Sequence, residues 1–498
     1  MSEAMRTSGE SILRVGMGGI VLAGATAALA GLLFGYDTGV ASGIQGYLQA
    51  FFHLSNAQLG FAIASLEMAC VPGALFAGTL ADRFGRKSIL ISCAVLFAVS
   101  GLLSAVAWSF VVLVLARMLG GLAIGASSMV APVYIAEIAP EKHRGRLGSL
   151  FQLAIVVGIA AVYWVNFLIL NVGGSLNAAH SGGADWNQTM GWRWMLGSEL
   201  LPALVFFAMI LSIPESPRWL VINNREPEGR TILTRFLGAV GAEREIQAVR
   251  AAAAQEEGRF AELFTPRYRL PLVMALVLAL FSQFSGIASV IYYTPRIFEA
   301  AGMKATSAFG STALVGMVNL VFTFIAVGLV DKAGRKVLLA IGTGIQVIAL
   351  ALVGVMFIVA NHKQTVGASG GMGSDAGMMF SHSQVIFLLV SLLTYIAAFA
   401  MAMGPIPWII ISEIFPARIR GRAASVGVLT LWMANAATTQ TFPILKAHAG
   451  LITTFFLYSG CSLISFLFVI LILPETKGKT LEQIEAYWQH RHESGVPG

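Results

Sequence analysis

Three charged side chains inside long apolar runs are the residues we single out for chemistry. They are Asp37, Arg117 and Glu199. An ionisable group within a membrane span costs roughly 2.5–3.5 kcal/mol on insertion scales, so such a group is a candidate functional residue. A carboxyl group in this setting can take up and release a proton. We therefore interpret Asp37 as a proton-binding residue.

The position of Asp37 alone allows a second interpretation. The residue lies near the end of the first apolar run, 15–44. At about 1.5 Å per residue this run is longer than a bilayer core of roughly 30 Å. Asp37 could therefore lie at the water boundary and cap a helix break among its neighbouring glycines, Gly35, Gly39 and Gly43.

The composition is that of a membrane protein. Hydrophobic residues make up 57% of the 498 residues, charged residues make up 11%, and the mean hydropathy is +0.77. These values exclude the soluble globular classes. The net charge is +7, but the basic residues form short clusters between apolar runs. That pattern is typical of membrane topology signals and not of nucleic-acid binding.

Nothing in the sequence indicates an enzyme. The three cysteines lie within apolar runs, and we find no metal-ligand spacing, no nucleophile–base arrangement and no phosphate-binding loop. We expect no metal and no cofactor, with the proton as coupling ion. The expected partners are a small molecule, the proton and the lipid bilayer.

Twelve apolar runs are long enough to cross a bilayer. They are 15–44, 57–81, 88–108, 110–136, 148–172, 192–213, 271–295, 308–330, 337–360, 383–412, 422–443 and 451–473. On one side, the loops hold only Arg193, Arg296, Lys304, Lys363 and Lys446. By the positive-inside rule the other side is cytoplasmic and holds both termini. We expect a multi-pass protein of the cell (inner) membrane.

Segments outside the runs differ in character. Residues 214–270 are rich in Arg, Glu and Ala with helical spacing of apolar residues, which indicates short amphipathic helices on the cytoplasmic face. Residues 171–191 and 361–382 are rich in Gly, Ser and Asn, and we expect flexible surface loops there.

Internal repeats indicate two related halves. DRFGRK at 82–87 recurs as DKAGRK at 331–336, EIAPEKHRG at 137–145 as EIFPARIRG at 413–421, and PES at 214–216 as PET at 474–476. Such repeats are typical of transporters with two parallel six-span halves. We predict an N-terminal six-helix bundle at 1–213, cytoplasmic linker helices at 214–270, a C-terminal six-helix bundle at 271–474 and a cytoplasmic tail at 475–498.

The motifs resemble those of the sugar porter branch of the major facilitator superfamily over almost the whole chain. They are GLLFGYDTGVASG, GTLADRFGRK, ARMLGGLAIGASSMVAPVYIAEIAP, PESPRWL, QFSGIASVIYY, DKAGRK, GPIPW, SEIFP and PETKGKTLEQIE. The loop 171–191 and the GWRWM after it look like the bacterial xylose–proton symporters, which are related to the glucose facilitators. The resemblance implies an all-α, monomeric protein of twelve transmembrane helices in two pseudo-symmetric bundles.

The resemblance also implies roles for the buried charges. In proton-coupled sugar porters the residues matching Asp37 and Arg117 are neighbours, whereas passive facilitators have asparagine in place of the aspartate. This chain has Asp37, so it looks like a proton symporter for a monosaccharide or related polyol, with Glu199 as a further participant. A passive facilitator and a porter-like nutrient sensor stay as alternatives.

Family positions give candidate sugar-binding and gating residues. The sugar-binding candidates are Phe34, Gln152, Ser282, Gln283, Tyr292, Tyr293, Asn319, Trp408 and Trp432. The gating candidates, Arg–carboxylate groups at the cytoplasmic helix ends, are Asp82, Arg86, Glu137, Arg144, Glu215, Asp331, Arg335, Glu413, Arg420 and Glu475. For the amides and aromatics, interhelical hydrogen bonding and core packing are the alternative roles. For the charged motifs, the alternative is to fix loop shape and topology.

Three positions depart from the family pattern. Ser282 replaces the first of two adjacent glutamines, Ala288 replaces an asparagine, and Leu431 replaces an amide before Trp432. A missing hydrogen bond to a buried hydroxyl costs on the order of 1 kcal/mol. We therefore predict that the site is not a standard glucose or xylose site, with Ser285 and Ser289 as partial substitutes.

Overall fold

The structure is a computed structural model that describes residues 3–140, 143–179, 185–253, 260–367, 380–415 and 417–475. This part of the chain is helical and contains no strand. Its helices are α1 Glu3–Phe51, α2 Asn56–Phe84, α3 Arg86–Ala105, α4 Phe110–Ile138, α5 Arg144–Ala179, α6 Trp192–Gly197, α7 Leu200–Ser212, α8 Pro217–Ile222, α9 Glu226–Ala253, α10 Pro266–Phe284, α11 Ile287–Ala300, α12 Ala305–Ala333, α13 Arg335–Gly367, α14 His382–Met401, α15 Ile406–Glu413 and α16 Ala417–Leu471. A π-helical turn, Asn187–Gly191, precedes α6, and a 3₁₀ turn, Phe260–Phe264, precedes α10.

The helices confirm the predicted class of an all-α membrane protein. In the described residues, 11 helical segments are long and apolar enough to cross a membrane. One of them, Gly421–Leu471, has 51 residues and is long enough for two crossings. It changes direction at Gly450, where φ is 74°, so the two last predicted spans follow each other there.

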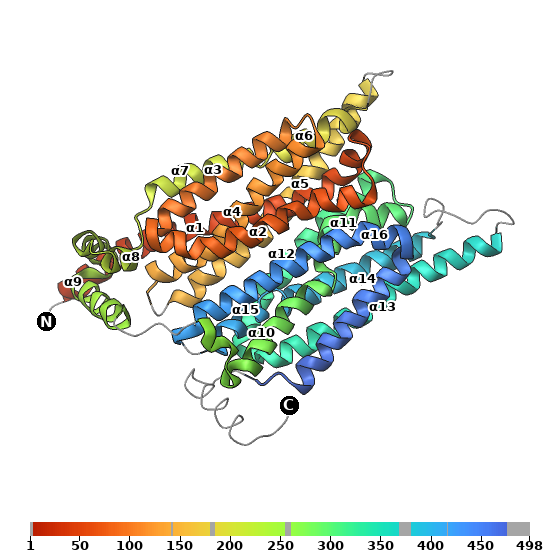
Figure 1. Ribbon diagram of the computed structural model, residues 1–498. Helices are drawn as coiled ribbons and strands as arrows, with labels where there is room; N and C mark the ends of the chain where they lie inside the picture. The colour runs from red at the N-terminus through yellow and green to blue at the C-terminus, as the bar shows by residue number, and fades with distance from the viewer. Residues whose placement is uncertain are drawn as a thin grey trace.

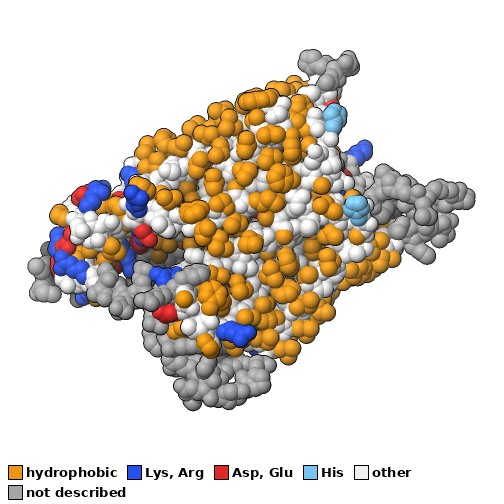
Figure 2. Space-filling model, in the orientation of Figure 1, with side chains coloured by type: hydrophobic (Ala, Val, Ile, Leu, Met, Phe, Trp, Pro, Cys, Tyr) orange, Lys and Arg blue, Asp and Glu red, His pale blue; other side chains and the backbone are white. Residues whose placement is uncertain are grey.

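The helices before and after the linker form two groups that lie side by side. Figure 1 shows α1–α7 in the upper part of the view and α10–α16 in the lower part, with α8 and α9 at one end. We call that end the linker end; the opposite end is where α1 finishes at Phe51 and α12 begins at Ala305. Hydrophobic side chains cover the flank between the two ends, and charged side chains gather at the linker end (Figure 2).

Two helices are longer than the sequence analysis predicted. Residues 171–179 continue α5 and residues 361–367 continue α13, so the expectation of loops there was wrong. In α5, polar side chains bond back to the preceding turn, from Asn171 Nδ2 to the Phe167 carbonyl and from Ser175 Oγ to the Asn171 carbonyl. Of the rest of the two predicted loops, 180–184 and 368–379 lie outside the described residues, and Asn187–Gly191 forms the π-helical turn.

The segment between the halves contains the short helices predicted for it. Ser216 caps α8 by accepting a hydrogen bond from the Trp219 amide, and Pro217 stands at the first turn, where its missing N–H is not needed. The apolar side of α9 packs Leu233, Ile246 and Val249 against Val221 of α8. On the exposed side, Arg230 and then Arg250 hold the pKa of Glu226 below its usual range through hydrogen bonds.

Two predicted spans are each built from a pair of helices. The seventh span is α10 followed by α11, and the tenth is α14 followed by α15. At the first break Gly286 adopts φ 86°, a left-handed conformation that favours glycine. Two tyrosines hold this break from neighbouring helices: the Tyr395 hydroxyl donates to the Ser285 carbonyl, and the Tyr458 hydroxyl bonds the Ser289 hydroxyl.

Replacing Gly286 by alanine tests how much the fold depends on this break. A Cβ atom there would lie 2.3 Å from Cδ2 of Tyr458, in addition to the backbone strain. Such strain costs about 1–3 kcal/mol, so we expect Gly286→Ala to lower the melting temperature of the purified protein. Gly328→Ala is the control, because an added methyl there meets nothing within 4 Å. Equal melting temperatures for the two variants would contradict the assignment.

Candidate proton and sugar site

The pair of Asp37 and Arg117 is the centre of the site. Asp37 is on α1 and Arg117 is on α4, and both side chains are 2% exposed. Arg117 Nη1 donates to Asp37 Oδ1 at 3.1 Å, while Asp37 Oδ2 has no hydrogen-bond partner. The structure therefore brings together the two residues that the family resemblance paired. It places Asp37 in the protein interior and not at an exposed helix end, which favours the first of the two interpretations of this residue.

Close packing of glycine leaves room for the Asp37 carboxylate. A Cβ atom on Gly120 of α4 would lie 2.6 Å from Asp37 Oδ2 and 2.7 Å from the Ser100 hydroxyl oxygen. Gly120 thus sits directly against the free oxygen of the carboxylate. Any larger residue at this position would displace the aspartate from Arg117.

Glu199 lies in the same electrostatic environment. It immediately precedes α7, is 1% exposed, and interacts electrostatically with both Asp37 and Arg117. Gly101 of α3 packs against its side chain, and its Oε1 atom has no hydrogen-bond partner. The three predicted proton-coupling residues therefore form one buried group.

A fourth charged residue was missed by the sequence analysis. Glu67 on α2 is fully buried, and it also interacts electrostatically with Arg117 and Asp37. The signal was present, since Glu67 lies in the apolar run 57–81 and meets the criterion that selected Asp37.

These four side chains impose a charge balance. One guanidinium group can neutralise one carboxylate, and an unpaired ionised carboxylate in a dry interior is very costly. Three carboxyl groups around one arginine are therefore stable only if two of them carry protons. The arrangement is suited to binding and releasing protons.

Two predicted sugar-binding residues meet across the two halves. The rings of Phe34 on α1 and Trp432 on α16 lie 5.3 Å apart between centroids. Trp432 is buried, and its indole N–H has no acceptor. Since buried polar groups ordinarily have partners, this N–H is a donor available to a ligand.

The other predicted sugar-binding residues are more dispersed. Gln283 Nε2 donates to Ser282 Oγ, and both residues are buried. Tyr293 packs against Phe442 and its hydroxyl donates to the Thr439 carbonyl, so it is held within the second half. Asn319 is buried, Gln152 is half-buried and Trp408 is 39% exposed. Ser285 and Ser289 already have hydrogen-bond partners, at the Ser282 carbonyl and the Tyr458 hydroxyl.

At the linker end, the first-half gating candidates form one network. The Glu215 carboxylate accepts from the backbone N–H groups of Arg86 and Lys87 at the start of α3. The Arg86 guanidinium pairs with Asp82 and with Glu137. These contacts are made within the first half. An anion at a helix N-terminus is stabilised by the free N–H groups and the helix dipole.

The second half repeats this arrangement. The Glu475 carboxylate accepts from the backbone N–H groups of Arg335 and Lys336 at the start of α13. Gly334 has φ 98°, and its counterpart Gly85 has φ 94°. The side chains of four further gating candidates lie outside the described residues. They are Arg144, Asp331, Glu413 and Arg420.

At the opposite end, side chains of the first half bind the backbone of α11. Pro295 lacks an N–H, so it leaves the carbonyl of Ile291 without its helical partner. The Tyr163 hydroxyl donates to that carbonyl at 2.7 Å. Gln45 Nε2 donates to the next carbonyl, that of Tyr292, also at 2.7 Å.

Further contacts join the halves at this end. Arg296 donates to Gln49 of α1, and Gln440 of α16 donates to the Ala57 carbonyl of α2. Sequence reasoning did not select Gln45 or Tyr163. Gln45 directly follows the apolar run 15–44, and Tyr163 is one of several aromatic residues in the run 148–172, so neither stood out.

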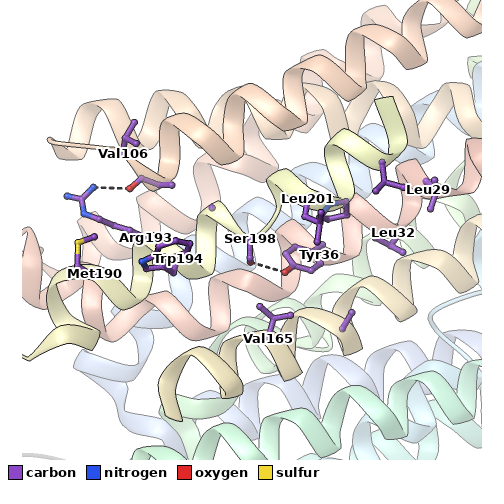
Figure 3. A pocket seen from close by; sticks show the side chains of 15 residues that line it. Leu29, Leu32, Tyr36, Val106, Val165, Met190, Arg193, Trp194, Ser198 and Leu201 are labelled. Atoms are coloured by element: carbon purple, nitrogen blue, oxygen red, sulfur yellow. Dashed lines mark hydrogen bonds between the residues drawn. The ribbon is translucent and has the colours of Figure 1, made fainter. Parts of the chain in front are cut away.

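A large groove lies apart from these residues, on the outside of the first half. It has a volume of about 1170 Å³, is mostly apolar, and is lined by residues from 29 to 36 on α1 and from 190 to 205 around α6 and α7. Figure 3 shows Tyr36 bonded to Ser198 inside it and Arg193 at one end. Trp194 and Leu201 are 60% and 73% exposed, so the groove belongs to the exposed apolar surface of the first half.

The fold and the site define a membrane transporter with two halves around buried charges. The chain matches the family described as "Sugar (and other) transporter" over residues 23–488, and it belongs to that family. The prediction of a transporter of this family, and not an enzyme, is confirmed.

Relatives and a solved structure agree with this assignment. The chain is 39% identical over 473 residues to the arabinose-proton symporter of Bacillus subtilis (strain 168), covering 95% of this chain and 96% of that protein. It is 35% identical over 495 residues to the D-xylose-proton symporter of Escherichia coli (strain K12), covering 93% and 94%. A partially occluded inward-open structure of the xylose transporter XylE from E. coli has a TM-score of 0.77 and 34% identity, covering 93% of this chain and 100% of that chain.

Replacing Gly120 by alanine tests the packing around Asp37. Overpacking of this kind costs about 1–3 kcal/mol, enough to displace the carboxylate from Arg117. We expect Gly120→Ala to lose proton-driven accumulation of substrate in proteoliposomes while the protein still folds. Gly78→Ala in α2 is the control, because its added methyl meets nothing within 4 Å. Unchanged accumulation by Gly120→Ala would show that the carboxylate position is not critical.

Proposed function

We propose that the protein transports a monosaccharide or related polyol together with a proton, by alternating access. The observation that carries the proposal is the buried pair of Asp37 and Arg117, with one carboxylate oxygen free of hydrogen bonds. The names of the two curated relatives, an arabinose-proton and a D-xylose-proton symporter, support it. A passive facilitator has no need of this acid.

The pair can exchange a proton if its geometry differs between states. Close to Arg117, Asp37 is stabilised as a carboxylate and gives up its proton. When the guanidinium moves away, the buried carboxyl group is more stable with a proton bound. Movement of α4 relative to α1 would therefore couple proton binding to the conformation of the carrier. Glu199 interacts electrostatically with both Asp37 and Arg117, and we propose that it takes part in the same proton exchange.

The gating groups fit the same cycle. Both halves hold a carboxylate that accepts backbone N–H groups at a helix start, and in the first half the Arg86 guanidinium also pairs with Asp82 and Glu137. Such pairs can bias an equilibrium between two conformations without locking it. We propose that the linker end is cytoplasmic, as the basic loops indicate, and that the opposite end is the extracellular gate.

The energy available from one proton is sufficient for useful accumulation. One charge that moves through 100 mV releases about 2.3 kcal/mol. At about 1.4 kcal/mol per factor of ten, this supports roughly fifty-fold accumulation of the sugar.

The proposed sugar site lies where the halves meet. The Phe34 and Trp432 rings offer an apolar face, and Gln283 with Ser282 offers hydrogen-bonding groups without charge. Ala288 and Leu431 are buried and cannot bond a sugar hydroxyl. We therefore expect a pattern of hydroxyl recognition that differs from a glucose or xylose site, and pentoses, hexoses and cyclitols all belong in the first substrate panel.

Uptake by Asp37→Asn tests the coupling. In proteoliposomes with an imposed inward proton gradient, we expect the native protein to concentrate one sugar of the panel. Asp37→Asn should only equilibrate or exchange that sugar, because the amide cannot ionise. Equilibration by the native protein would favour a facilitator, and accumulation by the variant would move the proton site to another residue. Absence of any uptake would favour a sensor.

Trp432→Phe tests the sugar site. The substitution keeps an aromatic ring but removes the unpartnered N–H. Loss of one hydrogen bond costs about 0.5–1.5 kcal/mol, so we expect KM for uptake to rise by about two- to tenfold. Trp194→Phe in the exposed apolar groove is the matched control and should leave KM unchanged. An unchanged KM in Trp432→Phe would exclude the indole as a sugar ligand.

A further inference from the structure

We propose that Glu67 is a second proton-binding site, which must be protonated for the gate at the opposite end to close. The site lies on α2, where the Glu67 side chain reaches Tyr292 of α11 in the other half. It is distinct from the pair of Asp37 and Arg117, which lies within the first half. This proposal needs one part of the proposed function, namely alternating access, in which the opposite end opens and closes.

The surroundings of Glu67 do not support a charged carboxylate. Its side chain is fully buried, and the neutral Tyr292 phenol is the polar side chain that reaches its carboxyl group. Arg117 interacts with Glu67, but it is already paired with Asp37. An ionised carboxylate in such a place carries a large desolvation cost, so in this closed arrangement Glu67 holds a proton.

The group that faces Glu67 belongs to the moving gate. The Tyr292 phenol of α11 interacts with both Glu67 and Thr38 of α1. The backbone carbonyl of the same tyrosine accepts the hydrogen bond from Gln45 that joins the halves. Closure therefore brings the phenol onto Glu67 and excludes water from it, and opening exposes the carboxyl group to the aqueous side.

The remaining neighbours offer no compensating positive charge. The other titratable groups that interact with Glu67 are Tyr293 on α11 and Cys70 on α2 itself. Two further helices pack on α2. Residues 423–445 of α16 and 88–105 of α3 contain no Asp, Glu, Lys, Arg or His.

The consequence is a pH-dependent gate. When the opposite end is open, Glu67 can ionise in contact with water, and the ionised form opposes closure. One proton linked to closure changes the ratio of open to closed molecules by up to about tenfold per pH unit. Acidic pH on that side favours closure, and alkaline pH favours opening.

Pulsed EPR distances between two spin labels test this directly. Asn56→Cys on α2 and Thr306→Cys on α12 place labels at exposed positions of the opposite end. Cys461 is replaced by serine, whereas Cys70 and Cys93 are buried and can stay. The full-length protein keeps Asp37, so that Arg117 stays paired with it, and is studied in lipid nanodiscs without sugar.

With Glu67 present, we expect the long-distance, open population to rise steeply between about pH 5.5 and about 8.5, a range that covers the titration of many buried carboxyl groups. Glu67→Gln should remove this response and leave the closed form dominant. Glu67→Asp should keep a response, because the acid is retained. A role in hydrogen bonding alone predicts instead that the glutamine variant behaves like the native protein.

The outcome separates this proposal from the proposed function. A pH response that persists in Glu67→Gln, or that is absent when Glu67 is present, would overturn the second site and leave symport through Asp37 intact. Loss of proton-driven uptake in Asp37→Asn tests symport alone, because the EPR samples keep Asp37 and contain no sugar.

Discussion

The structure depends on keeping few charges in a dry interior and balancing them. Among the described residues at this site, Arg117 is the single guanidinium beside three buried carboxyl groups. The folded protein is therefore stable only when some of these carboxyl groups carry protons. The surrounding packing follows from this condition. Gly120 and Gly101 give the carboxyl groups room, and a methyl at Gly120 would already contact Asp37 too closely. A site built in this way can change its proton content only when the helices around it move.

The contact between the halves depends on a second local constraint, which is the broken seventh span. Gly286 separates α10 from α11, and Pro295 then removes an N–H from α11. The carbonyl that becomes free is the one that Tyr163 binds from the first half. Backbone carbonyls inside a membrane must be bonded, and here a side chain of the other half does so. When the halves separate, water must replace Tyr163, so such a contact belongs on the side of a transporter that opens to water.

Much of this was accessible from the sequence because composition and repeats report on fold directly. The apolar runs, the paired DRFGRK and DKAGRK loops, and the family motifs led to the correct fold class and family. The pairing of Asp37 with Arg117 came from the resemblance and not from spacing, since the residues are 80 positions apart. The C-terminal end of α5 was misjudged because Gly, Ser and Asn in 171–179 suggested a loop, whereas the Asn171 and Ser175 side chains bond back along a helix.

What the sequence could not show is which residues meet across the two halves. Phe34 and Trp432 were both candidates, but their ring contact depends on how two bundles of helices pack. The same holds for Glu67 and Tyr292, which are far apart in the chain and share no motif. Glu67 was detectable as a charge in a span, yet its meaning arises only from the helix that it faces.

The two proposed proton sites lie in different places, so each would act at a different step of the transport cycle. Asp37 and Arg117 lie on α1 and α4 of one half, so their separation reports a change within that half. Glu67 faces α11 of the other half, so its burial reports whether the halves have closed at one end. Under the two proposals, a proton on Glu67 is required before closure, and the proton on Asp37 is exchanged as the interior of the first half rearranges. Arg117 interacts with both Asp37 and Glu67, and the two acids repel each other when both are ionised, so ionisation of one disfavours ionisation of the other. This coupling would order the two proton events and tie both to the movement of the halves.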